Sequence, residues 1–291
     1  MAVRPEHAEA IGRFLEALLA RDYGALEAVL ADDFIEVTPQ SGERIRGAPT
    51  FVEILRQAPE PPGLLAGPFL TSCRDDLVLA EAKFDYGGKP WWYVDRFELR
   101  DGRIRRMTSY FDEPFEPPEW RRPFVHLEPT IDPARWADDG DGEPVDRATI
   151  ERYIDATFSH DFVALARSLH ADYRGLHPQS GERFDATGYL AIGANYPGGL
   201  PQQRPIEVGG GSEEWVMTPT GVPIRVSGAA DTWFGEATWD YPSGDRSFAV
   251  LLAVFRGGKV WRERVYFCPP FEPAAWRADL VERYEPLASI G

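Results

Sequence analysis

The chain begins with hydrophobic positions spaced as on an amphipathic helix. The apolar residues that recur three and four positions apart are Ile11, Phe14, Leu18 and Leu19. Asp22 precedes a second short apolar stretch and has a side chain suited to an N-cap, so we expect a second helix there. Phe34–Thr38 then has the composition of a strand, and Gln40-Ser41-Gly42 has that of a turn.

A third helix and three long strands follow this turn. Thr50 and Glu53 have the spacing of a capping box, which predicts a helix over Phe51–Gln57. The next segments, LVLAEAKFDYGG, KPWWYVDRFEL and GRIRRMTSYF, are rich in aromatic and β-branched residues. Helices followed by consecutive strands indicate an α+β domain with an antiparallel sheet rather than alternating β and α units.

The second half of the chain repeats this pattern. FIEVTPQSGERIRG at 34–47 returns as YRGLHPQSGERFDA at 173–186, and GRIRRMTSYFDEPFEPPEWR at 102–121 returns as GKVWRERVYFCPPFEPAAWR at 258–277. The helical pattern also returns, with Asp161 in the place of Asp22. We infer a tandem duplication with domains at 1–121 and 146–291, a linker at 122–145, and 17 additional residues inside the second copy. The two PQSGER segments indicate a structural hairpin that contains a Glu–Arg pair.

The charge of the chain excludes several classes of partner. Lys and Arg number 31 against 47 Asp and Glu, a formal net charge of −16, so we expect neither nucleic acid nor an anionic membrane as a partner. No apolar run reaches the length of a membrane-spanning helix, the start of the chain has no signal-peptide pattern, and Cys73 and Cys268 are too few for a disulfide framework. These features predict a cytoplasmic protein. The five histidines are scattered and nucleotide-binding motifs are missing, so we expect neither a metal nor an organic cofactor.

Two pairs of segments carry a resemblance to a known family. They are RFLEALLARDYGALEAVLADDFIEVTP with FELRDGRIRRMTSYFD, and RYIDATFSHDFVALARSLHADYRGLHP with VFRGGKVWRERVYF. Both pairs resemble the NTF2-like superfamily, in its SnoaL-like and ketosteroid-isomerase-like branches. The resemblance implies two cystatin-like α+β cones, each with helices packed in a curved antiparallel sheet around an apolar pocket for a small organic molecule. It also implies an intramolecular pairing of the two domains as a pseudo-dimer, and a possible homodimer.

The resemblance also places candidate catalytic residues in the second copy. The family's general base falls on Thr38 in the first copy and on His177 in the second, and its hydrogen-bonding tyrosine falls on Tyr153. The pocket-facing positions of the last strand match Glu263, Val265 and Phe267. We therefore expect His177 as base, Tyr153 as donor and Glu263 as the group that orients the imidazole, with Val265 and Phe267 lining the pocket. The alternatives are a hydrogen-bonded His177, a core Tyr153 and an outward-facing Glu263.

Further candidates for substrate binding lie in both copies. Tyr93 and Asp95 alternate onto one face of a strand, so Asp95 is a candidate proton donor with a raised pKa. Asp112, after a Tyr-Phe pair, resembles the aspartate of limonene-type epoxide hydrolases, although the Arg-x-Asp partner of that family is missing here. In the additional residues of the second copy, Tyr196 and Trp215 either form a lid over a pocket mouth or belong to a hairpin that covers a sheet edge.

These features lead to one functional hypothesis and two alternatives. The leading hypothesis is cofactor-independent acid/base chemistry, of isomerase, cyclase or dehydratase type, in the pocket of the second domain. Its substrate would be a small apolar carbonyl compound, polyketide-like or terpenoid-like. The alternatives are a non-catalytic small-molecule-binding or protein-interaction module, and an epoxide hydrolase.

Overall fold

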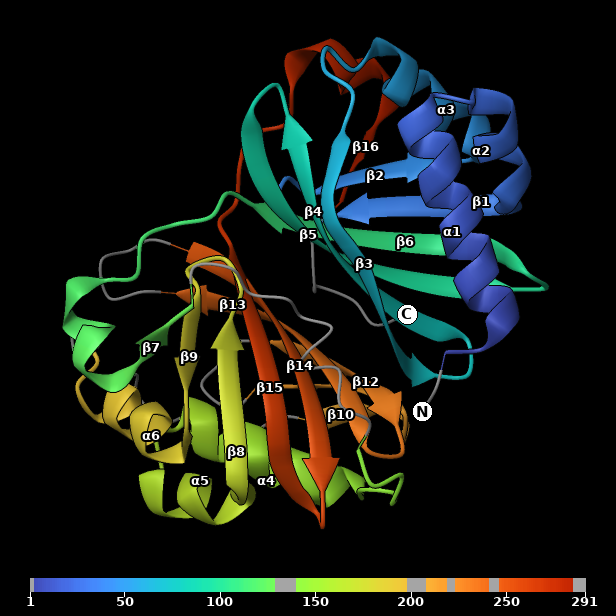
Figure 1. The fold of residues 1–291 in the computed structure, drawn as a ribbon. Coiled ribbons are helices and arrows are strands. Elements are labelled where there is room, and N and C mark those ends of the chain that lie inside the picture. Colours follow the sequence, from blue (N-terminus) through green and yellow to red (C-terminus); the bar gives the residue numbers. More distant parts are fainter. Residues whose placement is uncertain (1–2, 129–139, 198–207, 219–222, 241–245, 285–291) are drawn as a thin grey trace. The chain divides into compact units, whose positions relative to one another are not determined.

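The computed structural model describes residues 3–128, 140–197, 208–218, 223–240 and 246–284. These residues form two compact units. The N-terminal unit consists of the described residues up to Glu113 together with those from Cys268 onward, and the C-terminal unit consists of those from Pro114 to Phe267. Both units are α+β, as predicted (Figure 1).

The N-terminal unit has three α-helices on one face of a seven-stranded sheet (Figure 1). The strand order is β16-β2-β1-β6-β5-β4-β3. The apolar faces of the helices and of the sheet form one core, which includes Phe14, Leu26 and Phe97. Its elements are α1 (Pro5–Ala20), α2 (Tyr23–Val29), β1 (Leu30–Thr38), β2 (Glu43–Arg46), α3 (Ala48–Gln57), β3 (Gly63–Arg74), β4 (Leu77–Tyr86), β5 (Lys89–Arg100), β6 (Arg103–Asp112), η3 (Ala275–Leu280) and β16 (Glu282–Arg283).

The C-terminal unit follows the same order of elements, with two more strands. Its sheet has the order β10-β11-β12-β13-β14-β15-β8-β9-β7, and its core includes Tyr153, Tyr173 and Trp215. Its elements are η1 (Glu119–Phe124), β7 (His126–Leu127), α4 (Arg147–Phe158), α5 (Phe162–Ser168), β8 (Leu169–His177), β9 (Glu182–Phe184), α6 (Ala186–Ala194), β10 (Val208–Gly210), β11 (Glu214–Met217), β12 (Ile224–Ala229), β13 (Thr232–Asp240), β14 (Arg246–Arg256) and β15 (Lys259–Cys268).

Both sheets are mixed, whereas the sequence pattern predicts antiparallel sheets. β1 is antiparallel to β2 but parallel to β6, and β8 is parallel to β15 in the same way. The physical reason is the path of the chain, because α3 carries it from β2 to the far edge of the sheet. The meander β3–β6 then returns to β1 with its last strand in the same direction.

The predicted helix starts agree with the structure at two positions and differ at a third. Asp22 accepts a hydrogen bond from the backbone N–H of Ala25, and Asp161 caps α5 in the same way. The capping box at Thr50 is wrong, because α3 begins at Ala48 with Gly47 as its N-cap. A proline in the first turn suits this earlier start, since it supplies a helical φ and needs no backbone donor there.

The segments after the last strand of each copy pack in the unit of the other copy. η1 and β7 follow β6 in the chain, yet β7 pairs with β9 of the C-terminal unit. η3 and β16 follow β15, yet β16 pairs with β2 of the N-terminal unit. Figure 1 shows this exchange as red ribbon within the blue unit and green ribbon within the yellow and orange unit. The start of the predicted linker is therefore part of a folded unit.

The two PQSGER motifs bind these exchanged segments. The Gln40 side chain donates to the carbonyls of Phe111 and Pro269, so it links the end of β6 to the arriving segment. Gly42 has φ +64°, and a Cβ there would lie 2.9 Å from the carbonyl oxygen of Tyr284. Glycine is required at this turn both for its positive φ and for the close approach of the segment.

The additional residues of the second copy include a short hairpin. β10 and β11 pair antiparallel, and β11 continues the sheet beside β12. Residues 198–207, which precede the hairpin, lie outside the described part of the chain. The described residues form no helix that is long and apolar enough to cross a membrane.

Candidate functional site

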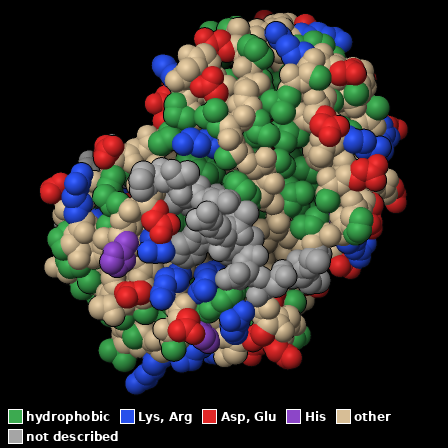
Figure 2. Space-filling view, in the orientation of Figure 1, with side chains coloured by type: hydrophobic (Ala, Val, Ile, Leu, Met, Phe, Trp, Pro, Cys, Tyr) green, Lys and Arg blue, Asp and Glu red, His purple; other side chains and the backbone are tan. Residues whose placement is uncertain are grey.

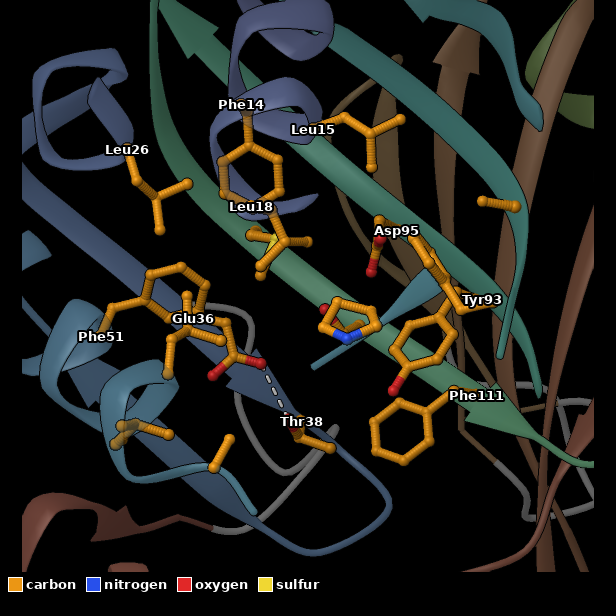
Figure 3. A pocket seen from close by; sticks show the side chains of 18 of the residues that line it. Phe14, Leu15, Leu18, Leu26, Glu36, Thr38, Phe51, Tyr93, Asp95 and Phe111 are labelled. Carbon is orange, nitrogen blue, oxygen red and sulfur yellow. Dashed lines mark hydrogen bonds between the residues drawn. The ribbon is translucent and has the colours of Figure 1, made fainter. Parts of the chain in front are cut away.

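The N-terminal unit contains a cavity of about 240 Å³ between its helices and its sheet (Figure 3). Figure 2 shows hydrophobic side chains gathered on the face of this unit where α1 lies beside β3. The wall is mostly aromatic and aliphatic, which suits an apolar ligand. Its apolar residues include Phe14, Leu18, Leu26, Phe51, Tyr93 and Phe111.

Glu36 points into this cavity from β1. Along the strand, Phe34, Glu36 and Thr38 alternate onto the inner face, and the Glu36 side chain is almost fully buried, with 5% exposure. The Thr38 hydroxyl donates to Oε1 of Glu36 at 2.8 Å (Figure 3). The other carboxyl oxygen, Oε2, is buried and has no hydrogen-bond partner among the described residues. One oxygen is thus held in place while the other remains available to a ligand.

Asp95 enters the same cavity from β5 (Figure 3). The Ser109 hydroxyl on the neighbouring strand is its hydrogen-bond partner, and the two residues face each other across the β5–β6 pair. Oδ1 of Asp95 is buried, and the part of the chain that the structure describes offers it no partner. Tyr93 lies two residues away on the same face, stacked on Phe111 at 4.7 Å between ring centroids. The cavity therefore contains two carboxyl groups, each with an unpaired oxygen.

Burial changes the titration of both carboxyl groups. Removal from water raises the pKa of Glu36 from 4.5 to about 7, and the negative charge of Asp95 adds to this rise. Burial likewise raises the pKa of Asp95 from 3.8 to about 7, against the hydrogen bond from Ser109. The pKa of the Tyr93 phenol lies well above its ordinary value for the same reason, so this group stays neutral. Near neutral pH the pair can therefore hold one proton, with one acid and one base in the same cavity.

Two residues of the exchanged C-terminal segment complete the wall. Trp276 and Arg277, both in η3, line the cavity. Nε and Nη2 of Arg277 bind the two carboxyl oxygens of Glu43 at 2.7 and 2.6 Å. Ser41 donates to the same carboxylate. The sequence predicts a Glu–Arg pair in the PQSGER hairpin, and the structure supplies its arginine from the FEPAAWR segment instead.

The predicted catalytic residues of the second copy fall into two groups. Tyr153 donates to Oε1 of Glu263 at 2.7 Å, and Tyr173 donates to Oε2. All three side chains are buried in the core of the C-terminal unit, and burial raises the pKa of Glu263. Both carboxyl oxygens of this glutamate are thus occupied by phenols of its own unit.

His177 is paired with a different carboxylate. Its Nδ1 lies 3.3 Å from Oε2 of Glu182, which also binds Arg121 at 2.8 Å. The imidazole packs between the rings of Phe184 and Phe267, at centroid distances of 4.9 and 5.1 Å. Burial lowers the pKa of His177, so the neutral imidazole is favoured. Glu182 of the PQSGER motif is therefore the carboxylate beside the imidazole, whereas the sequence analysis expected Glu263 in this role.

The equivalent of Glu36 in the C-terminal unit is a glycine. A Cβ on Gly175 would lie 2.1 Å from the ring of Phe184 and 2.7 Å from the Tyr173 hydroxyl. These side chains occupy the space that Glu36 fills in the N-terminal unit. The two copies therefore share a fold and differ in their interiors.

The remaining predicted residues are dispersed. Tyr196 packs edge-on against Trp120, and Trp215 is fully buried against Trp233 in the core, in the hairpin that extends the sheet. The last residue of β6 is Asp112, half-buried, with a pKa raised by burial. The two residues Val265 and Phe267 are partly buried on β15, on the same side as Glu263.

Sequence reasoning missed Glu36, although a signal for it was present. An acidic residue between Phe34 and Thr38 in strand alternation places a carboxyl on the inner face of a buried strand. Counting to the family's base position instead led to Thr38, which is the hydrogen-bond donor to this glutamate. Among the described residues, no three His, Cys, Asp or Glu side chains are grouped as metal ligands.

Comparison with known proteins places the chain among related folds. Residues 11–107 match the family model described as a SnoaL-like domain. An NTF-2 like protein of unknown function from Burkholderia xenovorans LB400 is 32% identical over 42% of this chain and 95% of its own, with a TM-score of 0.37. None of the curated proteins is detectably similar in sequence.

Two further solved structures carry functional names. An LEH-like epoxide hydrolase from M. tuberculosis is 28% identical over 37% of this chain and 79% of its own, with a TM-score of 0.33. A Kribbella flavida protein, named provisionally as a ketosteroid isomerase, is 22% identical over 43% of this chain and 91% of its own, with a TM-score of 0.39.

Proposed function

Because the chain belongs to the NTF2-like family and residues 11–107 form a SnoaL-like domain, we propose that its N-terminal cavity catalyses cofactor-independent acid/base chemistry. The substrate is a small apolar carbonyl compound, of polyketide-like or terpenoid-like character. The reaction is an isomerisation or a related cyclisation or elimination, each of which begins with removal of a proton beside a carbonyl group.

One observation carries this proposal. Glu36 and Asp95 each direct an unpaired, buried carboxyl oxygen into an apolar cavity, and both have a pKa of about 7. Unpaired polar atoms in a protein interior are unfavourable, and perturbed carboxyl groups in a cavity are typical of sites where protons are transferred. A carbonyl ligand would offer an acceptor to protonated Asp95 and an acidic C–H group to ionised Glu36.

The two carboxyl groups take complementary roles. Ionised Glu36, held by Thr38, accepts a proton from the carbon beside the substrate carbonyl. The electron pair of that C–H bond moves onto the carbonyl oxygen, and protonated Asp95 donates a hydrogen bond to the resulting enolate. Return of the proton to another carbon gives the isomer and restores Glu36. Each step conserves atoms and electrons without an added reactant.

Hydrogen–deuterium exchange tests this chemistry directly. The protein is incubated in D2O with simple ketones such as cyclohexanone, 1-indanone and 1-tetralone, and deuterium beside the carbonyl is followed by NMR. Wild type should accelerate exchange, and Glu36→Gln should reduce the acceleration by ~10²–10⁴-fold, the range for a positioned base. Glu27→Gln is the matched control, because Glu27 is an exposed glutamate on α2 of the same unit.

The same experiment separates the alternatives. Acceleration that persists in Glu36→Gln and Asp95→Asn but disappears in His177→Ala would transfer the activity to the second domain, as the sequence predicts. Ketone binding without exchange would favour a non-catalytic binding protein. Opening of a cyclic epoxide that depends on Asp112 would favour an epoxide hydrolase.

A further inference from the structure

Trp276 lies at the boundary between the N-terminal cavity and solvent. Its side chain lines the cavity, yet 40% of the residue's surface remains exposed to solvent. It is on η3, in the segment that follows the last strand of the second copy and packs in the first. A large, flat side chain that contacts both the cavity and the solvent is positioned at the entrance.

The segment that carries Trp276 is fixed at several points around this entrance. Arg277, the next residue, forms the two-bond ion pair with buried Glu43. Before it, the backbone N–H of Phe271 donates to the carbonyl of Gln40. After it, β16 pairs with β2. Contacts on both sides fix the backbone that carries Trp276, so the size of its side chain should affect what passes the entrance.

We propose that Trp276 is the residue that determines which molecules can enter the N-terminal cavity. A segment of the second copy thereby sets the selectivity of a site in the first. The inference rests on the proposed function for the identity of the site, but the entrance can be tested without any substrate. Small, flat molecules would pass the indole, and bulkier ones would be excluded until it is removed.

The chain supplies a matched control for this residue. Trp120 has the equivalent position in the first FEP..WR segment and is followed by Arg121, as Trp276 is followed by Arg277. It packs in the C-terminal unit, against Tyr196 and the core. Replacement of Trp120 removes an indole from the equivalent position in the other unit and leaves the N-terminal entrance unchanged.

A cysteine inside the cavity provides the readout. Ala82 on β4 is buried and lines the cavity, so Ala82→Cys places a thiol within it. The native residues Cys73 and Cys268 are buried, and the labelling of wild type gives their background. Rates are measured with methyl methanethiosulfonate and with the bulkier benzyl methanethiosulfonate, in Ala82→Cys alone and combined with Trp276→Ala, Trp276→Phe or Trp120→Ala.

Removal of the indole should raise the benzyl rate by about 10-fold or more and the methyl rate by less than about 3-fold, because a widened entrance favours the larger reagent. Trp276→Phe should lie between these values, and Trp120→Ala should leave both rates unchanged. Equal rises for both reagents, or no rise in a variant with wild-type circular dichroism and unfolding, would overturn the inference. Absence of ketone exchange would refute the proposed function alone, since labelling does not depend on catalysis.

Discussion

Replacement of Glu36 by glutamine should stabilise the protein at alkaline pH and change little at pH 5. Burial raises the folded-state pKa of Glu36 from 4.5 to about 7, so the unfolded chain ionises this group more readily. No stability is lost below the unfolded pKa of 4.5, where both states are protonated, and stability then falls as pH rises to about 7. With ~1.4 kcal/mol for each pKa unit, the full loss at pH 8 is about 3 kcal/mol. Glutamine does not ionise and avoids this loss.

The measurement is urea unfolding of wild type and Glu36→Gln at pH 5, 6, 7 and 8. The variant should gain about 3 kcal/mol at pH 8 and less than ~1 kcal/mol at pH 5, because most of the loss falls between pH 5 and 7. Glu27→Gln serves as the control, because Glu27 is an exposed glutamate on α2 and its replacement should change stability by less than ~0.5 kcal/mol at every pH.

A pH-independent difference between Glu36→Gln and wild type would refute this reasoning. It would mean that folding does not raise the pKa of the Glu36 carboxyl group and that the change in stability reflects packing alone. A stabilised variant that has also lost ketone exchange would instead identify Glu36 as a group retained for function at the expense of stability.

Three further changes test the exchanged segments and the second interior. Gly181→Ala should lower the free energy of unfolding by ~1 kcal/mol or more beyond the loss in Gly102→Ala, as measured by thermal unfolding. Both glycines have φ near +70°, but only a Cβ at Gly181 would meet a neighbouring carbonyl oxygen, at 2.6 Å. Equal losses in the two variants would contradict this close approach. Arg277→Met should cost ~3–5 kcal/mol in urea unfolding, because it leaves a buried carboxylate without its partner, and a loss below ~1 kcal/mol would show that this ion pair does not fix the segment. Tyr153→Phe should cost ~1–3 kcal/mol because Glu263 loses a hydrogen bond, and a neutral outcome would indicate that water replaces the phenol.

Local patterns in the sequence determined much of the fold. Helical spacing, Asp22 as a cap and the order of helices before strands predicted an α+β domain, and the repeated motifs predicted the same order of elements twice. Strand alternation also placed Asp95 beside Tyr93 on one face, and both line the cavity. These features depend on neighbours a few residues apart, so a single sequence contains them.

The tertiary structure decided which carboxyl groups enter the N-terminal cavity and what surrounds them. Counting to the family's base position led to Thr38, whereas Glu36, two residues before it, enters the cavity. At the equivalent position of the second copy, Gly175 leaves room for Phe184 and Tyr173. Trp276 reaches the cavity only because its segment pairs with a strand far away in the chain. Periodicity tells which side of a strand is apolar, but it does not tell which distant segment covers that side. That depends on pairing between remote residues, and so do the shape of the cavity and the pKa of each carboxyl within it.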